Sequence, residues 1–191
     1  MAVQAVSKPI TYEEWLRMPE TNQRYEIVDG VLQMSPAPNM LHQLLVGELS
    51  GIFRKLVPKS VGLVVTAPID VTVSRSPLKV RQPDVMVVLF REDGWRDVQA
   101  LLDAPPGEVI PDLVVVVLSP SESRVAVQEK IEDYQRAGVR EAWIVSPEAQ
   151  TVEVLRLSAQ KTERIGLYGR GDTVRSELLP ELQVDTDRLF A

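Results

Sequence analysis

Two unbroken runs of apolar residues dominate the hydrophobic pattern of the chain, and each follows a Pro-Asp pair. The first run covers residues 85–90 and the second covers residues 113–118. A short apolar run without alternation is typical of a strand that is buried on both faces. We therefore expect two central strands, with Asp84 and Asp112 at the points where a loop enters each strand.

These two aspartates allow two interpretations. Pro and Asp are common loop residues, so each pair can simply mark the turn that precedes a strand. A carboxylate fixed at the mouth of a rigid strand is also well placed to bind a metal ion. From the pattern alone we favour the loop interpretation for Asp84 and Asp112.

Residues 40–57 have the spacing of an amphipathic helix. Asn39 can cap this helix, Pro58 stops it, and His42 lies in its first turn. Leucine and isoleucine recur at spacings of three and four, which defines one apolar face. The residues of this predicted face are Leu41, Leu45, Leu49, Ile52 and Leu56.

A second helix is expected over residues 120–137. Ser119 is the predicted N-cap, and Gly138 ends the helix. Val127, Ile131 and Tyr134 form its predicted inner face, and Lys130 borders that face. The helix joins the strand that ends at Leu118 to another strand over 141–146, so we expect a right-handed crossover and a parallel pair.

A β-hairpin is expected near the N-terminus, because Asp29-Gly30 lies between two apolar runs. The register of a two-residue loop places Glu26 on the face opposite the core. The predicted core-face residues are Tyr25, Ile27, Leu32 and Met34. Further strands are expected over 62–66, 69–74, 151–157 and 162–168, with an irregular segment and one short helix over 91–108.

The fold class that follows is α/β (α+β): a mixed β-sheet flanked by helices, with an N-terminal β-hairpin. The length of 191 residues indicates a single domain over 1–191. The formal net charge of −6 predicts weak non-specific binding to DNA. The chain has no cysteine, no signal-peptide pattern and no apolar run long enough to span a membrane, so we expect a cytoplasmic protein.

The candidate chemistry comes from carboxylates near the two central strands. Cleavage of a phosphodiester by a metal ion needs carboxylates that hold the ion and a group, often lysine, that orients or deprotonates water. The candidates are Asp84, Asp112, position 116 and Lys130. The chain has no Gly-rich phosphate loop, no G-x-S-x-G and no metal-ligand His pair, which leaves a small-molecule enzyme without support.

Several motifs then resemble one family in their order along the chain. They are YEIVDGVL, SPAPNMLHQ, RQPDVMVV, PDLVVVVLSPS, EKIEDYQRAGVREAWIV and GDTVRSELLPEL. This pattern resembles the Uma2 family, also called DUF820, over about residues 10–190. The resemblance implies the restriction-endonuclease-like fold of the PD-(D/E)xK superfamily, an Mg²⁺- or Mn²⁺-dependent endonuclease activity, and DNA as a partner. It leaves a homodimer open.

The resemblance also implies roles for individual residues. Asp84, in QPD with Gln82, matches the central metal-binding Asp. Lys130 and Tyr134 match a Lys-x-x-x-Tyr on the helix after the core strand. Glu26 and His42 match polar positions that are frequent in the family.

The chain departs from the family pattern at the second metal carboxylate. The family has Glu in PDLVVEVLSP, whereas this chain has Val116 there. Asp112 lies four residues away on the same strand, about 13 Å, and cannot fill the position. Glu26 or Glu48 could reach in from other elements. A frequent family Asp is also missing, because Ala126 stands in its place.

Each candidate keeps a structural alternative. Lys130 can extend along the edge of a buried face, Glu26 can be a solvated hairpin residue, and His42 is favoured as a packing residue. For the whole protein, two functions stay open. One is an endonuclease-like enzyme whose metal site is impaired by Val116. The other is a catalytically inactive protein of nuclease fold that binds nucleic acid or a protein partner. A basic patch near Asp84 would favour DNA, and could form from Lys55, Lys59, Arg75, Lys79 and Arg81.

Overall fold

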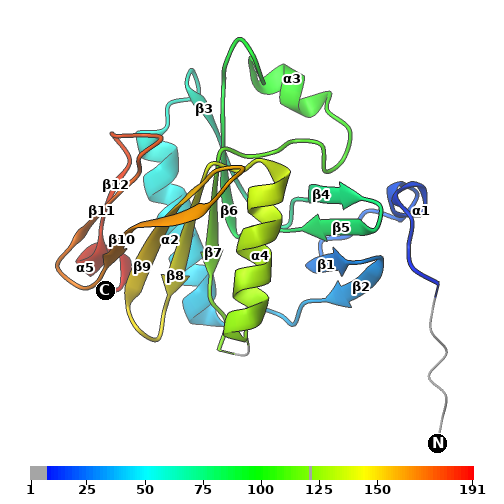
Figure 1. Ribbon diagram of the computed structural model, residues 1–191. Helices are drawn as coiled ribbons and strands as arrows, with labels where there is room; N and C mark the ends of the chain where they lie inside the picture. The colour runs from blue at the N-terminus through cyan, green and yellow to red at the C-terminus, as the bar shows by residue number, and fades with distance from the viewer. Residues whose placement is uncertain (1–7, 121) are drawn as a thin grey trace, which may run out of the picture.

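A computed structural model describes residues 8–120 and 122–191, and a six-stranded mixed sheet forms its centre (Figure 1). The strand order is β10-β9-β8-β7-β6-β3, and among these neighbours only β7 and β8 are parallel. The strands are β3 (Gly62–Thr66), β6 (Val85–Leu89), β7 (Leu113–Val117), β8 (Glu141–Ser146), β9 (Thr151–Leu157) and β10 (Thr162–Tyr168). The two apolar runs are therefore adjacent central strands, and the predicted parallel pair is confirmed.

Two helices cover the two faces of this sheet. Figure 1 shows α4 (Arg124–Ala137) in front of the sheet and α2 (Met40–Leu56) behind it. Leu49 and Phe53 of α2 pack in one buried cluster, and Ile131 and Tyr134 of α4 pack in another. Because both faces are covered, side chains of β6 and β7 are buried whichever way they point, which explains the absence of alternation.

A second sheet, which the sequence pattern does not predict, lies beside the first. Its strand order is β2-β1-β5-β4. The strands are β1 (Tyr25–Val28), β2 (Val31–Met34), β4 (Val71–Arg75) and β5 (Leu78–Arg81). The segment Leu78–Arg81 was not among the expected strands, and it pairs with both β4 and β1.

The hairpin β1–β2 has the predicted register, with Asp29 and Gly30 at positive φ in the turn. The predicted core face is only half right. Tyr25 and Ile27 are buried with Trp15, whereas Leu32 and Met34 of β2 are exposed. The reason is that β2 is the edge strand of its sheet, so β1 alone reaches the core.

Both long helices differ from prediction near their N-termini. In α2, Asn39 caps the helix as predicted, but His42 is buried and Leu41 is 52% exposed. Helix α4 begins at Arg124 with Ser123 as its cap, not at Pro120 with Ser119. Residue 121 of the predicted helix lies outside the described residues. Glu122 still accepts a hydrogen bond from the amide of Ser119, which forms a separate turn before the helix.

The remaining elements are short. They are α1 (Tyr12–Leu16), α3 (Val98–Leu102), β11 (Thr173–Arg175), β12 (Gln183–Asp185) and α5 (Thr186–Leu189). The helix α1 has a capping box between Thr11 and Glu14, and α3 is the short helix expected within 91–108. In the described part of the chain, no helix is both long and apolar enough to cross a membrane.

Candidate functional site

Asp84 and Val116 lie opposite each other where β6 and β7 meet. Val85 pairs with Val115 and Met86 with Val114; Asp84 directly precedes this ladder on one strand and Val116 directly follows it on the other. The Asp84 amide donates to the Val115 carbonyl oxygen over 3.0 Å, and Asp84 and Val116 line one pocket together with Lys130 and Tyr134 of α4. The two side chains therefore share the face of the sheet that α4 covers.

A pocket of about 220 Å³ opens beside this pair of residues. It lies between the central sheet, α4, β1 and the segment that leads into α2. The predicted site residues that line it are Glu26, His42, Gln82, Asp84, Val116, Lys130 and Tyr134. The strand pattern and the family resemblance therefore selected side chains that come together in space.

The Asp84 carboxylate is buried and receives three hydrogen bonds. Its Oδ1 accepts from Nη1 of Arg24 over 2.5 Å and lies 3.1 Å from Nε2 of His42. Its Oδ2 accepts from the Val117 amide over 2.7 Å. Burial raises the pKa of Asp84, but the hydrogen bond from His42, the charge of Arg24 and the Val117 amide outweigh burial and lower the pKa below its ordinary value.

Arg24 precedes β1 and reaches across to the central sheet. Besides Asp84, its guanidinium binds the Gln82 carbonyl oxygen through Nη2 over 2.8 Å. Its Nε is buried and has no hydrogen-bond partner among the described residues. The Asp84 carboxylate and the Gln82 carbonyl oxygen, which both lie in the segment before β6, thus fix the Arg24 guanidinium inside the pocket.

Lys130 lies between two carboxylates on the other side of the pocket. Its Nζ is 2.6 Å from Oε1 of Glu122 and 3.3 Å from Oε1 of Glu26. Burial lowers the pKa of Lys130, but the charges and hydrogen bonds of Glu26 and Glu122 outweigh burial and raise the pKa above 10.5. Lys130 is therefore a fixed ammonium group at neutral pH, and it can donate a hydrogen bond but not accept a proton.

A buried ion-pair network holds Glu26 in place from behind. The guanidinium of Arg81 donates to Glu26 over 2.7 Å and to Asp133 of α4 over 2.6 Å. Lys79 and Arg136 also bind Asp133. Glu26 is thus not solvated. Arg81 links it to Asp133 of α4 through charges, which corrects the solvated-hairpin interpretation of Glu26.

Two more predicted residues have polar surroundings at the pocket wall. Gln82 accepts a hydrogen bond from the Tyr25 amide and donates one to Asp70 over 2.9 Å. Tyr134 is 1% exposed, and burial first, then the charges of Glu26 and Asp84, raise its pKa well above 10. The phenol therefore stays protonated and offers a hydrogen-bond donor to the pocket.

Asp112 is the one predicted site residue that lies elsewhere. It is buried at the opposite end of β7, where its Oδ2 accepts from the Leu89 amide over 2.8 Å. Its Oδ1 pairs with Arg91 and, over 3.4 Å, with Arg140. These contacts are those of a residue that fixes a loop to a strand, as the loop interpretation expected.

Glu48, one of the predicted alternatives for the missing carboxylate, lies outside the pocket. Its Oε1 binds Nε of Arg188 over 2.7 Å, and it does not line the pocket. Glu26 does line the pocket, but Arg81 and Lys130 already neutralise it. Neither of the two predicted alternatives, Glu26 and Glu48, is thus an unpaired carboxylate at the pocket.

The residues present do not fit a divalent cation. Val116 is 4% exposed and offers only carbon atoms to the pocket. The Asp84 carboxylate is held by Arg24 and His42, and Glu26 by two cations. Across the described residues, no three His, Cys, Asp or Glu side chains converge into a group that could hold a metal ion.

Three of the five residues of the predicted basic patch are paired with carboxylates. Arg75 pairs with Glu108, and Lys79 and Arg81 pair with Asp133. Because each of these cations already has an anionic partner, the three residues provide little free charge for phosphates.

The arrangement of the six-stranded sheet and the pocket at its centre defines the class of protein. The fold is restriction-endonuclease-like, with the site at the entry of a central strand. The sequence pattern of Uma2, described as "Putative restriction endonuclease", matches residues 12–187. The chain therefore belongs to the Uma2 family, which confirms the resemblance seen in its motifs.

One similar solved structure supports the same assignment. The chain is 25% identical to "a putative nuclease belonging to DUF820" from Anabaena variabilis ATCC 29413, with a TM-score of 0.74. The match covers 95% of this chain and 98% of that chain. No curated protein matches the sequence.

Sequence reasoning missed three charged residues of the site. Arg24 stands next to the YEIVDG motif, Asp133 stands inside KIEDY, and Glu122 was interpreted only as a capping residue. Asp133 follows Lys130 by three positions, a spacing that puts both on nearly the same side of a helix. That spacing was the available signal for Asp133, whereas nothing local indicates the partner of Arg24.

Proposed function

We propose that this chain is an endonuclease-like protein with an impaired metal site. It binds Mg²⁺ or Mn²⁺ weakly and cleaves DNA slowly or not at all. The observation that carries the proposal is the position of Val116 beside Asp84 in the pocket. Membership of a nuclease family supports the nuclease-like class, and the apolar side chain at position 116 supports the impairment.

The physical reason is the loss of a preorganised ion. In a two-carboxylate site both groups set the position of the ion before the transition state forms. A single carboxylate leaves the ion mobile, and here that carboxylate is already neutralised by Arg24 and His42. The chain's own residues can still bind and orient a phosphodiester. Lys130 and the phenol of Tyr134 are protonated donors at the pocket wall.

The test is a cleavage assay with plasmid DNA and single-stranded DNA, each with Mg²⁺ or Mn²⁺. The proteins compared are the wild type and Asp84→Ala, purified in parallel so that a contaminating nuclease appears in both. We expect no cleavage that depends on Asp84. Efficient metal-dependent cleavage by the wild type that Asp84→Ala abolishes would show that another group supplies the missing ligand, and the proposal would be wrong.

A second function, a non-catalytic binding module, is favoured by the surface near the pocket. The first turns of α2 expose Met40 (76%), Leu41 (52%) and Leu44 (63%) beside Asn39 and His42, which line the pocket. Exposed apolar side chains grouped on one helix are typical of a surface that binds another protein. Binding of labelled DNA at low and high salt separates a module that binds nucleic acid from one that binds a protein partner, because phosphate contacts weaken steeply with salt.

A further inference from the structure

Asp84 already has a cation bound to it, and this cation belongs to the chain itself. Nη1 of Arg24 lies 2.5 Å from Oδ1 of Asp84, and Nη2 lies 2.8 Å from the carbonyl oxygen of Gln82. These two contacts leave the buried Nε of Arg24 without a partner in the described part of the chain. The guanidinium is thus positioned by Asp84 and by the Gln82 carbonyl oxygen, and its third donor, Nε, makes no hydrogen bond to the described residues.

We propose that Arg24 is the resident cation of Asp84 and excludes a divalent ion from it. The inference rests on the proposed function, because it adds a second and separate cause of the weak metal binding proposed there. Val116 removes one ligand of the ion. Arg24 blocks the ligand that remains.

The geometry of the carboxylate leaves little room for both cations. Oδ1 is shared by Arg24 and His42, and Oδ2 binds the Val117 amide. A Mg²⁺ ion binds oxygen at about 2.0–2.1 Å. An ion on Oδ1 would therefore stand next to the guanidinium, and two like charges at that distance repel strongly in a half-buried site. The ion can enter only when Arg24 leaves.

Arg24 competes with an advantage that a free ion lacks. It is tethered next to Asp84, so its binding needs no loss of translational freedom. An arginine guanidinium carries a positive charge at neutral pH. A free divalent ion must also lose part of its water shell, which Mg²⁺ does reluctantly. The exclusion is therefore expected to persist over the whole neutral pH range.

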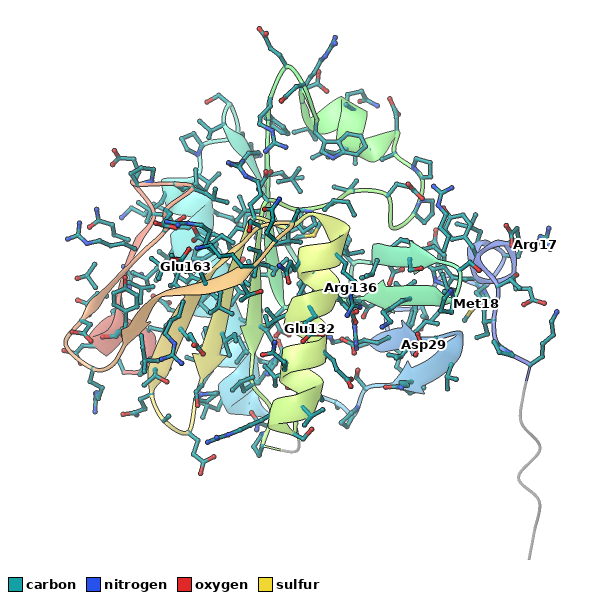
Figure 2. The ribbon with its side chains drawn as sticks, in the orientation of Figure 1. Arg17, Met18, Asp29, Glu132, Arg136 and Glu163 are labelled. Carbon is teal, nitrogen blue, oxygen red and sulfur yellow. The ribbon has the colours of Figure 1, made fainter. Side chains whose placement is uncertain are left out.

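The experiment measures binding of Mn²⁺ by thermal unfolding and by calorimetry. The variants are Val116→Glu, Arg24→Gln and the double variant, each compared with the wild type. The matched control is Arg17→Gln, which removes one positive charge from an exposed position on the far side of the hairpin (Figure 2). Only Mn²⁺ is added, so that no substrate or cleavage is needed for the readout.

We expect the double variant to bind Mn²⁺ at least about ten times more tightly than Val116→Glu alone, with a rise in Tm of about 3–6 °C at an Mn²⁺ concentration ten times the dissociation constant. Arg24→Gln alone should show a smaller gain in Mn²⁺ affinity over the wild type than the double variant shows. Arg17→Gln should behave like the wild type. Equal affinities of Val116→Glu and the double variant would show that Arg24 does not compete, and would overturn this inference.

The two proposals fail in different ways. Strong Asp84-dependent cleavage by the wild type overturns the proposed function, whatever Arg24 does. Unchanged Mn²⁺ affinity after removal of Arg24 overturns only the exclusion by Arg24. If Arg24→Gln does not fold, Arg24→Met removes the cation but keeps an unbranched side chain of similar length, so its Mn²⁺ affinity with Val116→Glu must exceed that of Val116→Glu alone. An equal affinity contradicts the inference.

Discussion

Arg24 and Asp84 form a contact of 2.5 Å that joins the two sheets of the molecule at the pocket. Arg24 precedes the first strand of the smaller sheet, and Asp84 precedes a central strand of the larger one. The helix α4 completes the pocket with Lys130. The site therefore depends on the docking of the hairpin against the central sheet, and variants that disturb this docking should affect stability and the site together.

The strongest test of the docking is Asp133→Asn. Asp133 is 1% exposed and binds Arg81, Lys79 and Arg136. Loss of its charge leaves the buried guanidinium of Arg81 with Glu26 as its one remaining carboxylate partner among the described residues. Removal of one member of a buried ion pair costs about 3–5 kcal/mol in the free energy of unfolding. Urea unfolding of the variant and the wild type measures this loss.

The matched control for this prediction is Glu132→Gln on the same helix. Figure 2 labels Glu132 and Arg136 on α4. Glu132 is an exposed partner of Arg136 at 3.3 Å, and such a pair contributes at most about 0.5 kcal/mol. A loss of similar size in Asp133→Asn and Glu132→Gln would mean that the buried network does not hold the hairpin in place.

Two glycines in helices should respond to alanine in opposite directions. Gly138 ends α4 with φ of 99°, and a Cβ there would meet no atom within 4 Å, so Gly138→Ala costs only the strain of the left-handed backbone, about 1 kcal/mol. Gly51 lies inside α2 with equally open surroundings. There Ala should stabilise the protein by about 0.5–1 kcal/mol. Changes of the same sign in urea unfolding would be inconsistent with these backbone conformations.

The pH dependence of stability should reveal the buried phenol of Tyr134. In the unfolded chain this phenol loses its proton near pH 10, whereas burial raises its pKa well above that value in the folded protein. The group's contribution is therefore fully present below pH 10 and is lost as the pH rises further. We expect the unfolding free energy of Tyr134→Phe to fall less steeply than that of the wild type, by up to about 1.4 kcal/mol per pH unit above about pH 10.

The measurement for Tyr134 is urea unfolding at about pH 8 and at several values above about pH 10. The difference between Tyr134→Phe and the wild type at the lower pH gives the cost of the lost hydroxyl, and its change with pH isolates the ionisation. Parallel curves for the two proteins would show that the phenol is accessible and titrates normally in the folded state.

The parts of the fold that local sequence determines could be predicted. The turn at Asp29-Gly30 set the hairpin register, Asn39 and Gly138 marked one end of each long helix, and the two apolar runs became neighbouring strands. Each of these signals acts within a few residues. The strand Leu78–Arg81 was missed because its alternation of apolar and basic residues covers only four positions; it pairs with the neighbouring β4 and with the distant β1.

The candidate site was predictable only in part for the same reason. Asp84 and Val116 could be placed together because they belong to the two recognisable central strands. Arg24 could not, since its partner is 60 positions away in the sequence. For Asp133 the spacing from Lys130 indicates the side of the helix, but not its buried partner Arg81, which is 52 positions away. The burial of His42 agrees with its favoured interpretation as a packing residue, but its ion-pair partner was not predicted. The helix turns its histidine, not Leu41, toward the pocket because the Asp84 carboxylate offers His42 a partner there.

The central claim is that position 116 is where this chain lacks a metal carboxylate. The most direct test is the thermal unfolding of the wild type and Val116→Glu, each with and without Mn²⁺. An ionised Glu buried without an ion is unfavourable, so the variant should melt below the wild type without metal and recover several degrees when Mn²⁺ is added. The wild type should show almost no change. A wild type that Mn²⁺ stabilises as strongly as the variant, with loss of the effect in Asp84→Ala, would contradict the account, as would a Val116→Glu variant that Mn²⁺ does not stabilise.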